Sequence, residues 1–248
     1  MINNYIALDI ETTGLNPAND KIIEIGMAKV ENGVITAKYQ QLINPQRPID
    51  ERITQLTGIN DSMVENAPVI NDIIQEIIDF IGELPILGHN VIFDYSFLKK
   101  SAVNNKLTFE KDGIDTLKIA RRLLPDVEHR NLEYLCEHFH IDAGSSHRAY
   151  DDAVSAKCLY EKLYDIKPDD DIFEKANKLN YTVKRDVPIT IAQKNYLLSL
   201  VSYYKLELKE PIDQLTKSRA SKLIDGIISE YGKMPCELPQ TIKVCGFC

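Results

Sequence analysis

Residues 5–14 are YIALDIETTG, a short apolar run that ends in acidic residues, threonines and a glycine. The run predicts a buried strand, and its Thr-Thr-Gly end predicts a turn directly afterwards. Asp9 and Glu11 stand two residues apart, so their carboxylates project from one face of that strand. Ligands of α/β proteins bind at the carboxyl ends of central strands. This stretch therefore predicts an α/β fold and the place of its site.

The surrounding chain supports an α/β domain over residues 1–166. Strand-like runs at 22–30 and 34–43 flank Glu31-Asn32-Gly33, which is a hairpin signal. Shorter strands are expected at 85–88 and 113–116. Helical spacing of apolar residues predicts helices at 71–81, 94–103, 117–124, 132–139 and 150–164. Strands first, then strands interleaved with helices, indicate a mixed sheet, here of five strands, flanked by helices.

Beyond this domain the chain changes character. Residues 167–188 are charged and contain Pro168, so we interpret them as a linker. Residues 189–234 show helical spacing and form a small accessory region, and residues 235–248 form a C-terminal tail. Some forty residues are near the lower limit for independent stability, so docking on the main domain or on a partner is expected.

The C-terminal region leaves two questions open. Its basic residues could bind nucleic acid, contact a partner, or simply form a solvated helix face; they include Lys194, Lys205, Lys209, Lys217, Arg219 and Lys222. Cys236, Cys245 and Cys248 have the pair spacing of a zinc knuckle, but no fourth ligand is evident.

Composition narrows the class of protein without deciding it. The 248 residues are 44% hydrophobic and 27% charged, which is typical of a soluble globular protein. No apolar run is long enough to span a membrane and the N-terminus has no basic leader, so a cytoplasmic location is expected. Residues 1–166 carry 16 basic against 26 acidic residues. Bound divalent cations can reverse the negative electrostatic potential of such an acidic region, so the acidity does not exclude a nucleic-acid substrate.

Two further acidic features come later in the chain. Residues 89–94, HNVIFD, lead from a strand into a helix, and Asp94 falls at the helix start. His147 stands just before another helix, and Asp152 falls in the first turns of that helix. Taken singly, each has an ordinary explanation, namely a helix N-cap aspartate or a surface histidine beside capping acids.

Taken together, these residues resemble the DEDDh family of 3′–5′ exonucleases. The matching motifs are DIETTG at residues 9–14, HN-x-x-FD at 89–94, and His147-x4-Asp152-Ala153. The resemblance covers residues 3–166 and is closest to the proofreading (epsilon-type) exonucleases of bacterial DNA polymerase III. It implies a ribonuclease H-like fold. The related branch of the family has tyrosine where this chain has Arg148.

The resemblance also implies a mechanism with two Mg²⁺ or Mn²⁺ ions, in which Asp9 bridges both. Glu11 and Asp152 complete one metal site, and Asp94 supports the other. Neutral His147 removes a proton from the attacking water, and the product is a nucleoside 5′-monophosphate. The residue types fit, because paired carboxylates are costly without a cation and hard oxygen ligands suit these metals.

For the terminal nucleotide, the resemblance implies contacts from two segments: Thr12, Thr13, Gly14 and Leu15, and His89, Asn90 and Phe93. Phe93 can pack on a base or sugar, or belong to the core. The expected substrate is a single-stranded or frayed DNA 3′ end, and a DNA polymerase is a partner implied by resemblance alone. Three alternatives stay open: an RNA substrate, a catalytically silent binding module, and a stand-alone repair or turnover nuclease.

Overall fold

The computed structural model describes residues 1–142, 144, 148–208 and 210–234. The chain divides at Arg185/Asp186 into two compact units. His147 and the cysteines Cys236, Cys245 and Cys248 lie outside the described residues. The base proposed from the sequence and the tentative zinc motif are therefore not part of the structural description.

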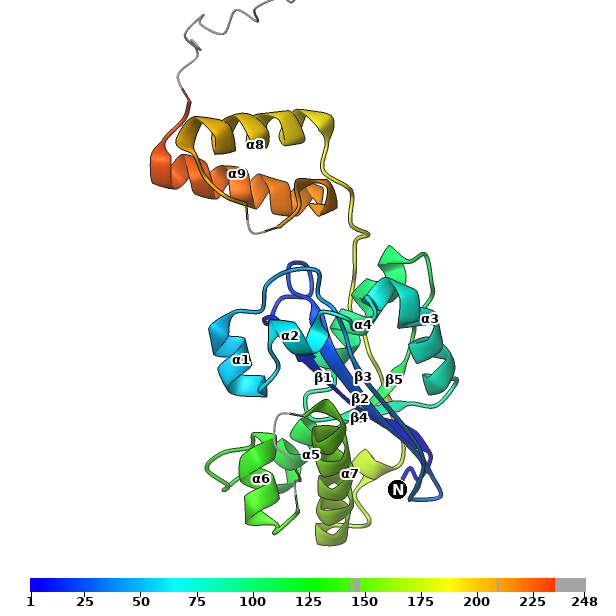
Figure 1. Ribbon diagram of the computed structural model, residues 1–248. Helices are drawn as coiled ribbons and strands as arrows, with labels where there is room; N and C mark the ends of the chain where they lie inside the picture. The colour runs from blue at the N-terminus through cyan, green and yellow to red at the C-terminus, as the bar shows by residue number, and fades with distance from the viewer. Residues whose placement is uncertain (143, 145–147, 209, 235–248) are drawn as a thin grey trace, which may run out of the picture. The chain divides into compact units, whose positions relative to one another are not determined.

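The first unit contains a mixed sheet with the strand order β3-β2-β1-β4-β5-β6 (Figure 1). Strand β1 pairs in parallel with β4, and β4 with β5, whereas the β1–β2, β2–β3 and β5–β6 pairs are antiparallel. The strands are β1 (Tyr5–Thr12), β2 (Ile22–Glu31), β3 (Val34–Leu42), β4 (Ile86–Gly88), β5 (Asp112–Asp115) and β6 (Asn177–Lys178). The mixed α/β architecture expected from the sequence is thus confirmed.

The number of strands differs from the expected five. The additional strand β6 pairs with β5 and comes from the charged stretch interpreted as a linker. Phe173 and Leu179, on either side of β6, are buried in the first unit. Asp170 is also buried, and Arg122 and Lys167 neutralise it. Two apolar anchors and a paired carboxylate therefore fix a segment whose composition alone indicates a loop.

Helices cover both faces of this sheet (Figure 1). The described helices of the first unit are α1 (Glu51–Thr57), α2 (Asp61–Val64), α3 (Ile70–Ile81), α4 (Ile92–Asn104), α5 (Thr116–Leu123), α6 (Leu132–His138), α7 (Ala149–Ile166) and the 3-10 turn η1 (Asp171–Phe173). Helices α3 and α4 share a hydrophobic core with one face of the sheet, and α5, α6 and α7 share a core with the other.

Strand β1 shows how the two faces are divided. Ile6, Leu8 and Ile10 pack in the α3–α4 core, whereas Tyr5 and Ala7 pack in the α7 core. Side chains alternate along a strand. The odd-numbered residues that follow Ala7 therefore face helix α7, and these residues include both acidic positions of β1.

The second unit is a small helical hairpin of α8 (Ile191–Tyr204), the 3-10 turn η2 (Ile212–Gln214) and α9 (Lys217–Tyr231). It has its own core, formed by Leu197, Leu200, Leu215, Ala220 and Ile224. A capping box of Thr190 and Gln193 starts α8, and the Thr216 side chain caps α9. The unit therefore contains its own helix-start signals and apolar core.

Among the residues that the structure describes, no helix combines the length and apolarity needed to cross a membrane.

Candidate metal centre

Three carboxylates meet where the end of β1 faces the start of α7. Asp9 and Glu11 project from the α7 side of β1, and Asp152 lies in the first turn of α7. One carboxylate oxygen from each residue can be chosen so that all three lie within 4.8 Å of one another. This is the only such cluster of potential metal ligands among the described residues.

Asp94 is a fourth carboxylate that lines the same cavity as the cluster. It lies in the first turn of α4 but is not the N-cap, which is Val91. Its Oδ1 instead accepts a hydrogen bond from the backbone N–H of Ile10 at 3.1 Å, and only 3% of the residue is exposed. The N-cap explanation for Asp94 is therefore wrong. The hydrogen bond ties the start of α4 to the strand that carries Asp9 and Glu11.

The crowding of these acids disfavours their charged forms. Burial raises the pKa of Asp9 well above its ordinary value, and the charges of Asp94 and Glu11 add to this rise. Burial and the nearby Asp152 raise the pKa of Glu11 to about 7. Burial also raises the pKa of Asp94, despite its backbone hydrogen bonds. Without a cation, the centre therefore retains protons near neutral pH.

A divalent cation would remove this electrostatic conflict. The donor set consists of hard carboxylate oxygens, which Mg²⁺ and Mn²⁺ prefer. Within the described chain, the nearby cation Arg148 is already paired with Glu24. The residues present thus fit one or two divalent cations held by Asp9, Glu11, Asp152 and Asp94.

The carboxylates open onto a cavity of about 270 Å³. Of the positions expected from the sequence, Asp9, Glu11, His89, Asn90, Phe93, Asp94 and Asp152 line it. The start of α6 supplies a wall that sequence reasoning missed, formed by Asn131, Leu132, Glu133 and Cys136. No motif marks these α6 residues, because they reach the cavity only through the packing of α6 against α7.

His89 forms part of the cavity wall through two hydrogen bonds. Its Nε2 lies 2.7 Å from the carbonyl oxygen of Arg130, and its Nδ1 lies 2.9 Å from the Thr116 hydroxyl. Because a carbonyl only accepts, Nε2 donates and Nδ1 of a neutral ring is left to accept from Thr116. Burial lowers the pKa of His89, which favours this neutral form. His89 is therefore held in a fixed orientation.

Asn90 and Phe93 complete that side of the cavity. Asn90 adopts a left-handed backbone conformation with φ of 69°, and its N–H donates to Asp115. Phe93 lines the cavity and also packs on Phe97, with ring centroids 5.1 Å apart. The two interpretations of Phe93, as a substrate wall and as part of the core, are compatible.

The other expected substrate contacts, at the end of β1 and in the loop after it, lie outside the cavity lining. Thr12, Thr13, Gly14 and Leu15 do not line the cavity. The Thr12 hydroxyl donates to the Gly14 carbonyl, and the Thr13 hydroxyl accepts from the N–H of Lys21. Leu15 is 85% exposed, so it is available to a ligand larger than the cavity.

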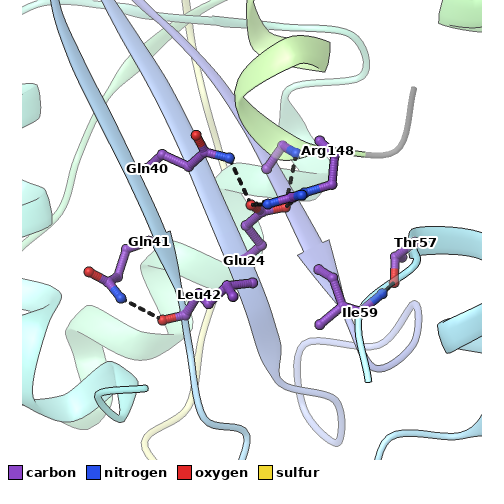
Figure 2. Close-up of polar contacts among 8 residues, drawn as sticks. Glu24, Gln40, Gln41, Leu42, Thr57, Ile59 and Arg148 are labelled. Atoms are coloured by element: carbon purple, nitrogen blue, oxygen red, sulfur yellow. Dashed lines mark hydrogen bonds and ion pairs between the residues drawn. The ribbon is translucent and has the colours of Figure 1, made fainter. Parts of the chain in front are cut away.

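A buried ion pair beside the centre was also missed by sequence reasoning. Glu24 of β2 is fully buried and pairs with Arg148, the residue before α7 (Figure 2). In the β1–β2 register Glu24 stands directly opposite Glu11. Its sequence context, IIEIG, indicates only a buried strand, and its partner is 124 residues away.

Comparison with known proteins gives one family match and several relatives. A family model described as an exonuclease matches residues 6–160. The PolC-type DNA polymerase III of Caldanaerobacter subterraneus is 32% identical over 237 residues, which cover 90% of this chain and 17% of that protein. That of Clostridium perfringens is 33% identical over 97% of this chain and 17% of its own length. The chain thus spans about a sixth of these relatives.

Among solved structures, exonuclease X in complex with 5′ overhanging duplex DNA is similar. It has a TM-score of 0.54 and 25% sequence identity, and the match covers 66% of this chain and 93% of that one. The match extends over nearly all of exonuclease X, so the whole of that fold is present in this chain.

Proposed function

This chain belongs to the exonuclease family, and on that premise we propose that it is a two-metal-ion 3′–5′ exonuclease acting on DNA 3′ ends. The products are nucleoside 5′-monophosphates. The observation that carries the proposal is the set of Asp9, Glu11 and Asp152, whose carboxylate oxygens can lie within 4.8 Å of one another at a cavity. A nearby fourth carboxylate, Asp94, extends the set toward a second cation.

In this proposal Asp9, Glu11, Asp152 and Asp94 hold Mg²⁺ or Mn²⁺ ions against the phosphate of the 3′-terminal nucleotide. Bound cations supply charge neutralisation for the phosphate and lower the pKa of a nearby water. His147 takes the proton from that water, which requires a neutral imidazole. The position of His147 rests on the sequence motif alone.

The substrate side of the proposal uses the cavity walls. His89, fixed by hydrogen bonds at both ring nitrogens, and Asn90 form one wall next to Phe93. Phe93 offers a ring face to the terminal base or sugar, and base–aromatic stacking tolerates any base. Leu15, largely exposed on the loop after β1, is proposed as an apolar contact for the next nucleotide. Little sequence preference is expected.

DNA is proposed as the substrate because of the names of the relatives and the DNA bound in the similar solved structure. The matched proteins are named as DNA polymerases, and the similar solved structure holds duplex DNA. A role in proofreading or repair is part of the same proposal.

The test uses 5′-labelled oligonucleotides with Mg²⁺ or Mn²⁺, and EDTA as control. Single-stranded DNA, paired duplex ends, mismatched duplex ends and RNA of the same sequence are compared. Stepwise shortening from the 3′ end and release of nucleoside 5′-monophosphates are expected, with single-stranded or mismatched DNA preferred. Equal or faster shortening of RNA would overturn the choice of substrate, and shortening in EDTA would overturn the role of metal.

The assigned base has its own test. His147→Ala is expected to abolish turnover while leaving Mn²⁺ binding largely intact, because the imidazole is proposed to move a proton and not to hold metal. Asp9→Ala should lose both turnover and Mn²⁺ binding. Turnover is followed on labelled DNA and binding by titrating free Mn²⁺ with electron paramagnetic resonance. Full turnover in either variant contradicts the mechanism.

A further inference from the structure

We propose that Glu24 and Arg148 are positioning residues, which together fix the start of α7 and so hold Asp152 against the acidic end of β1. The inference rests on the proposed function, because it assigns these two residues a role in that same site. Neither side chain lines the cavity.

The contacts of Glu24 converge on the start of α7. Arg148 Nη2 donates to Glu24 Oε1 at 2.8 Å, and Arg148 Nε lies 3.2 Å from Oε2. The backbone N–H of Ala149 donates to Oε2 at 3.2 Å, and Gln40 of β3 donates to Oε1 at 2.9 Å (Figure 2). One carboxylate thus bonds both the side chain of residue 148 and the first amide of the helix.

Glu24 supplies the capping hydrogen bond that the N-cap side chain of α7 does not make. The N-cap residue is Arg148, and its side chain makes no capping hydrogen bond. The first amides of a helix have no partner within the helix, and a negative charge there is favourable. The Glu24 carboxylate of β2 supplies both the hydrogen-bond acceptor and the negative charge. The direction and depth of α7 are therefore set by a strand far away in sequence.

Gly26, two residues further along β2, allows this close approach. A Cβ at Gly26 would lie 2.0 Å from the backbone nitrogen of Tyr150 and 2.2 Å from the carbonyl carbon of Ala149. Gly26 stands opposite Asp9 in the β1–β2 register, as Glu24 stands opposite Glu11. The two β2 residues that hold α7 are therefore the cross-strand neighbours of the two acidic residues of β1.

The link from this pair to the metal centre is short. The backbone N–H of Asp152 donates to the carbonyl of Arg148 at 3.0 Å, so the ligand is one helical turn from the anchored residue. A shift of Arg148 therefore moves Asp152, and displacements of about 1 Å at reacting groups can cost about 100-fold in rate.

A purely stabilising role is the competing explanation. Buried ion pairs add little net stability, because desolvation of both charges offsets their attraction. Arg122 and buried Asp170 form a similar pair in the same unit, remote from the cavity lining. Arg122→Met is the control for Arg148→Met, since each removes a partly exposed arginine from a buried carboxylate. Asp170 keeps Lys167 in the control, whereas Glu24 keeps its hydrogen bonds from Gln40 and the Ala149 amide.

The experiment compares wild type, Arg148→Met, Arg148→Lys and Arg122→Met as full chains. Single-turnover cleavage of labelled single-stranded DNA at saturating Mg²⁺, Mn²⁺ affinity and thermal unfolding are measured. For Arg148→Met, the cleavage rate constant and the Mn²⁺ affinity are each expected to fall about 10- to 100-fold, the range for residues that orient ligands. Arg148→Lys keeps the charge but not the planar fork, so it should lie in between. Removing one partner of a buried ion pair leaves the other charge unpaired, so the unfolding temperature of Arg148→Met should fall at least as far as that of Arg122→Met. Cleavage and Mn²⁺ binding are compared at a temperature where both variants are folded.

The Mn²⁺ measurement separates positioning from simple charge. Arg148 is a cation beside Glu11, so its removal by a charge effect alone would tighten Mn²⁺ binding or leave it unchanged. Either result overturns the proposal, as does a cleavage rate within about two-fold of the Arg122→Met control. If Arg148→Met does not fold, Arg148→Lys is judged by the same criteria. If wild type binds Mn²⁺ but cleaves no DNA, the proposed function fails and Mn²⁺ affinity alone decides this inference.

Discussion

Asp9 is the residue at which the charges of the centre converge. Burial and the neighbouring carboxylates raise its pKa, so the metal-free fold is strained by its ionisation. Asp9→Asn removes one charge at nearly constant volume. At pH 8 without metal, the variant is expected to unfold at a higher temperature than wild type, by about 2–4 °C for each kcal/mol of relieved repulsion. Differential scanning fluorimetry measures this.

The same variant should lose its response to metal. In the proposed mechanism Mg²⁺ binds only the folded state and so is expected to stabilise wild type, and Asp9→Asn removes one of its proposed ligands. An Mg²⁺-induced rise in unfolding temperature as large as that of wild type would contradict the assignment of Asp9.

The raised pKa of Glu11 predicts that the stability of the metal-free protein depends on pH. Its pKa is about 7 in the fold, raised from an ordinary value of 4.5. Between these values the folded state binds more protons than the unfolded state, so raising the pH destabilises the fold. The stability from Glu11 is present in full below about pH 4.5 and is lost as pH rises through about 7. Urea unfolding in EDTA from pH 5 to 8 measures it.

Glu11→Gln is the reference for that series, because His89 acts in the opposite direction. Burial lowers the pKa of His89, so its contribution grows as pH rises toward the ordinary histidine value. The free energy of unfolding of wild type relative to Glu11→Gln should fall with pH in EDTA, and saturating Mg²⁺ should reduce this fall. A relative stability that rises with pH would contradict the raised pKa.

Asp151 and Asp152 provide an internal comparison at neighbouring positions. Asp152 lines the cavity and joins the carboxylate cluster, whereas Asp151 does neither. Asp152→Asn is expected to reduce turnover at least about 100-fold, and Asp151→Asn should stay within a few-fold of wild type. Steady-state cleavage of single-stranded DNA at several Mn²⁺ concentrations measures both. Comparable losses in the two variants would remove the distinction between them.

At the scale of elements, helix α7 depends on the missing side chain of Gly26. In Gly26→Ala the new Cβ would meet the backbone of Ala149 and Tyr150, which cannot move without shifting the helix. A loss of about 3 kcal/mol in unfolding free energy is expected, together with lower turnover at temperatures where the variant is folded. Urea unfolding and single-turnover cleavage measure the two effects.

Gly113→Ala is the control for Gly26→Ala. Gly113 is also a strand glycine, but the nearest atoms to its Cβ would belong to the Leu179 side chain at 2.8–2.9 Å, not to the backbone of a helix. A smaller loss of stability and nearly normal turnover are expected. If Gly113→Ala costs as much as Gly26→Ala, close approach of α7 is not the reason for the glycine.

Elements with a clear hydrophobic period could be predicted from sequence, and those defined by tertiary packing could not. Strand β1 and helix α3 lie within two residues of their expected bounds, since apolar spacing sets them. Asp9 and Glu11 share a face because side chains alternate along a strand. Glu24 could not be found in this way, because its partner Arg148 is 124 residues distant. The wall from α6 was missed for the same reason.

At the scale of the whole molecule, charge was a poor guide to where the first unit ends. The charged stretch after α7 indicated a linker, yet Phe173 and Leu179 are 1% and 5% exposed within that unit. Two isolated apolar residues show no hydrophobic periodicity in the sequence. They are buried only because they pack against a sheet edge and a helix face in the folded unit. The unit accordingly continues to Arg185.

Truncation tests where the catalytic unit ends. A fragment of residues 1–163 lacks Phe173 and Leu179, and loss of two such buried side chains costs roughly 5 kcal/mol or more, comparable with the total stability of many domains. That fragment is expected not to fold. A fragment of residues 1–185 keeps both side chains and β6, so it should unfold cooperatively and cleave short single-stranded DNA at the wild-type rate.

The 1–185 fragment also isolates the role of the helical hairpin. The α8–α9 hairpin has its own core, and the core residues of the first unit all precede Arg185. The fragment therefore keeps those cores and the four carboxylates of the metal centre. Short and long single-stranded DNA are compared by initial rate and by the number of nucleotides removed per binding event. A defect confined to long DNA would assign the hairpin to substrate binding, and normal cleavage of both would exclude that role. Loss of activity on short DNA, in a fragment that still binds Mn²⁺, would mean that the catalytic site needs residues beyond Arg185.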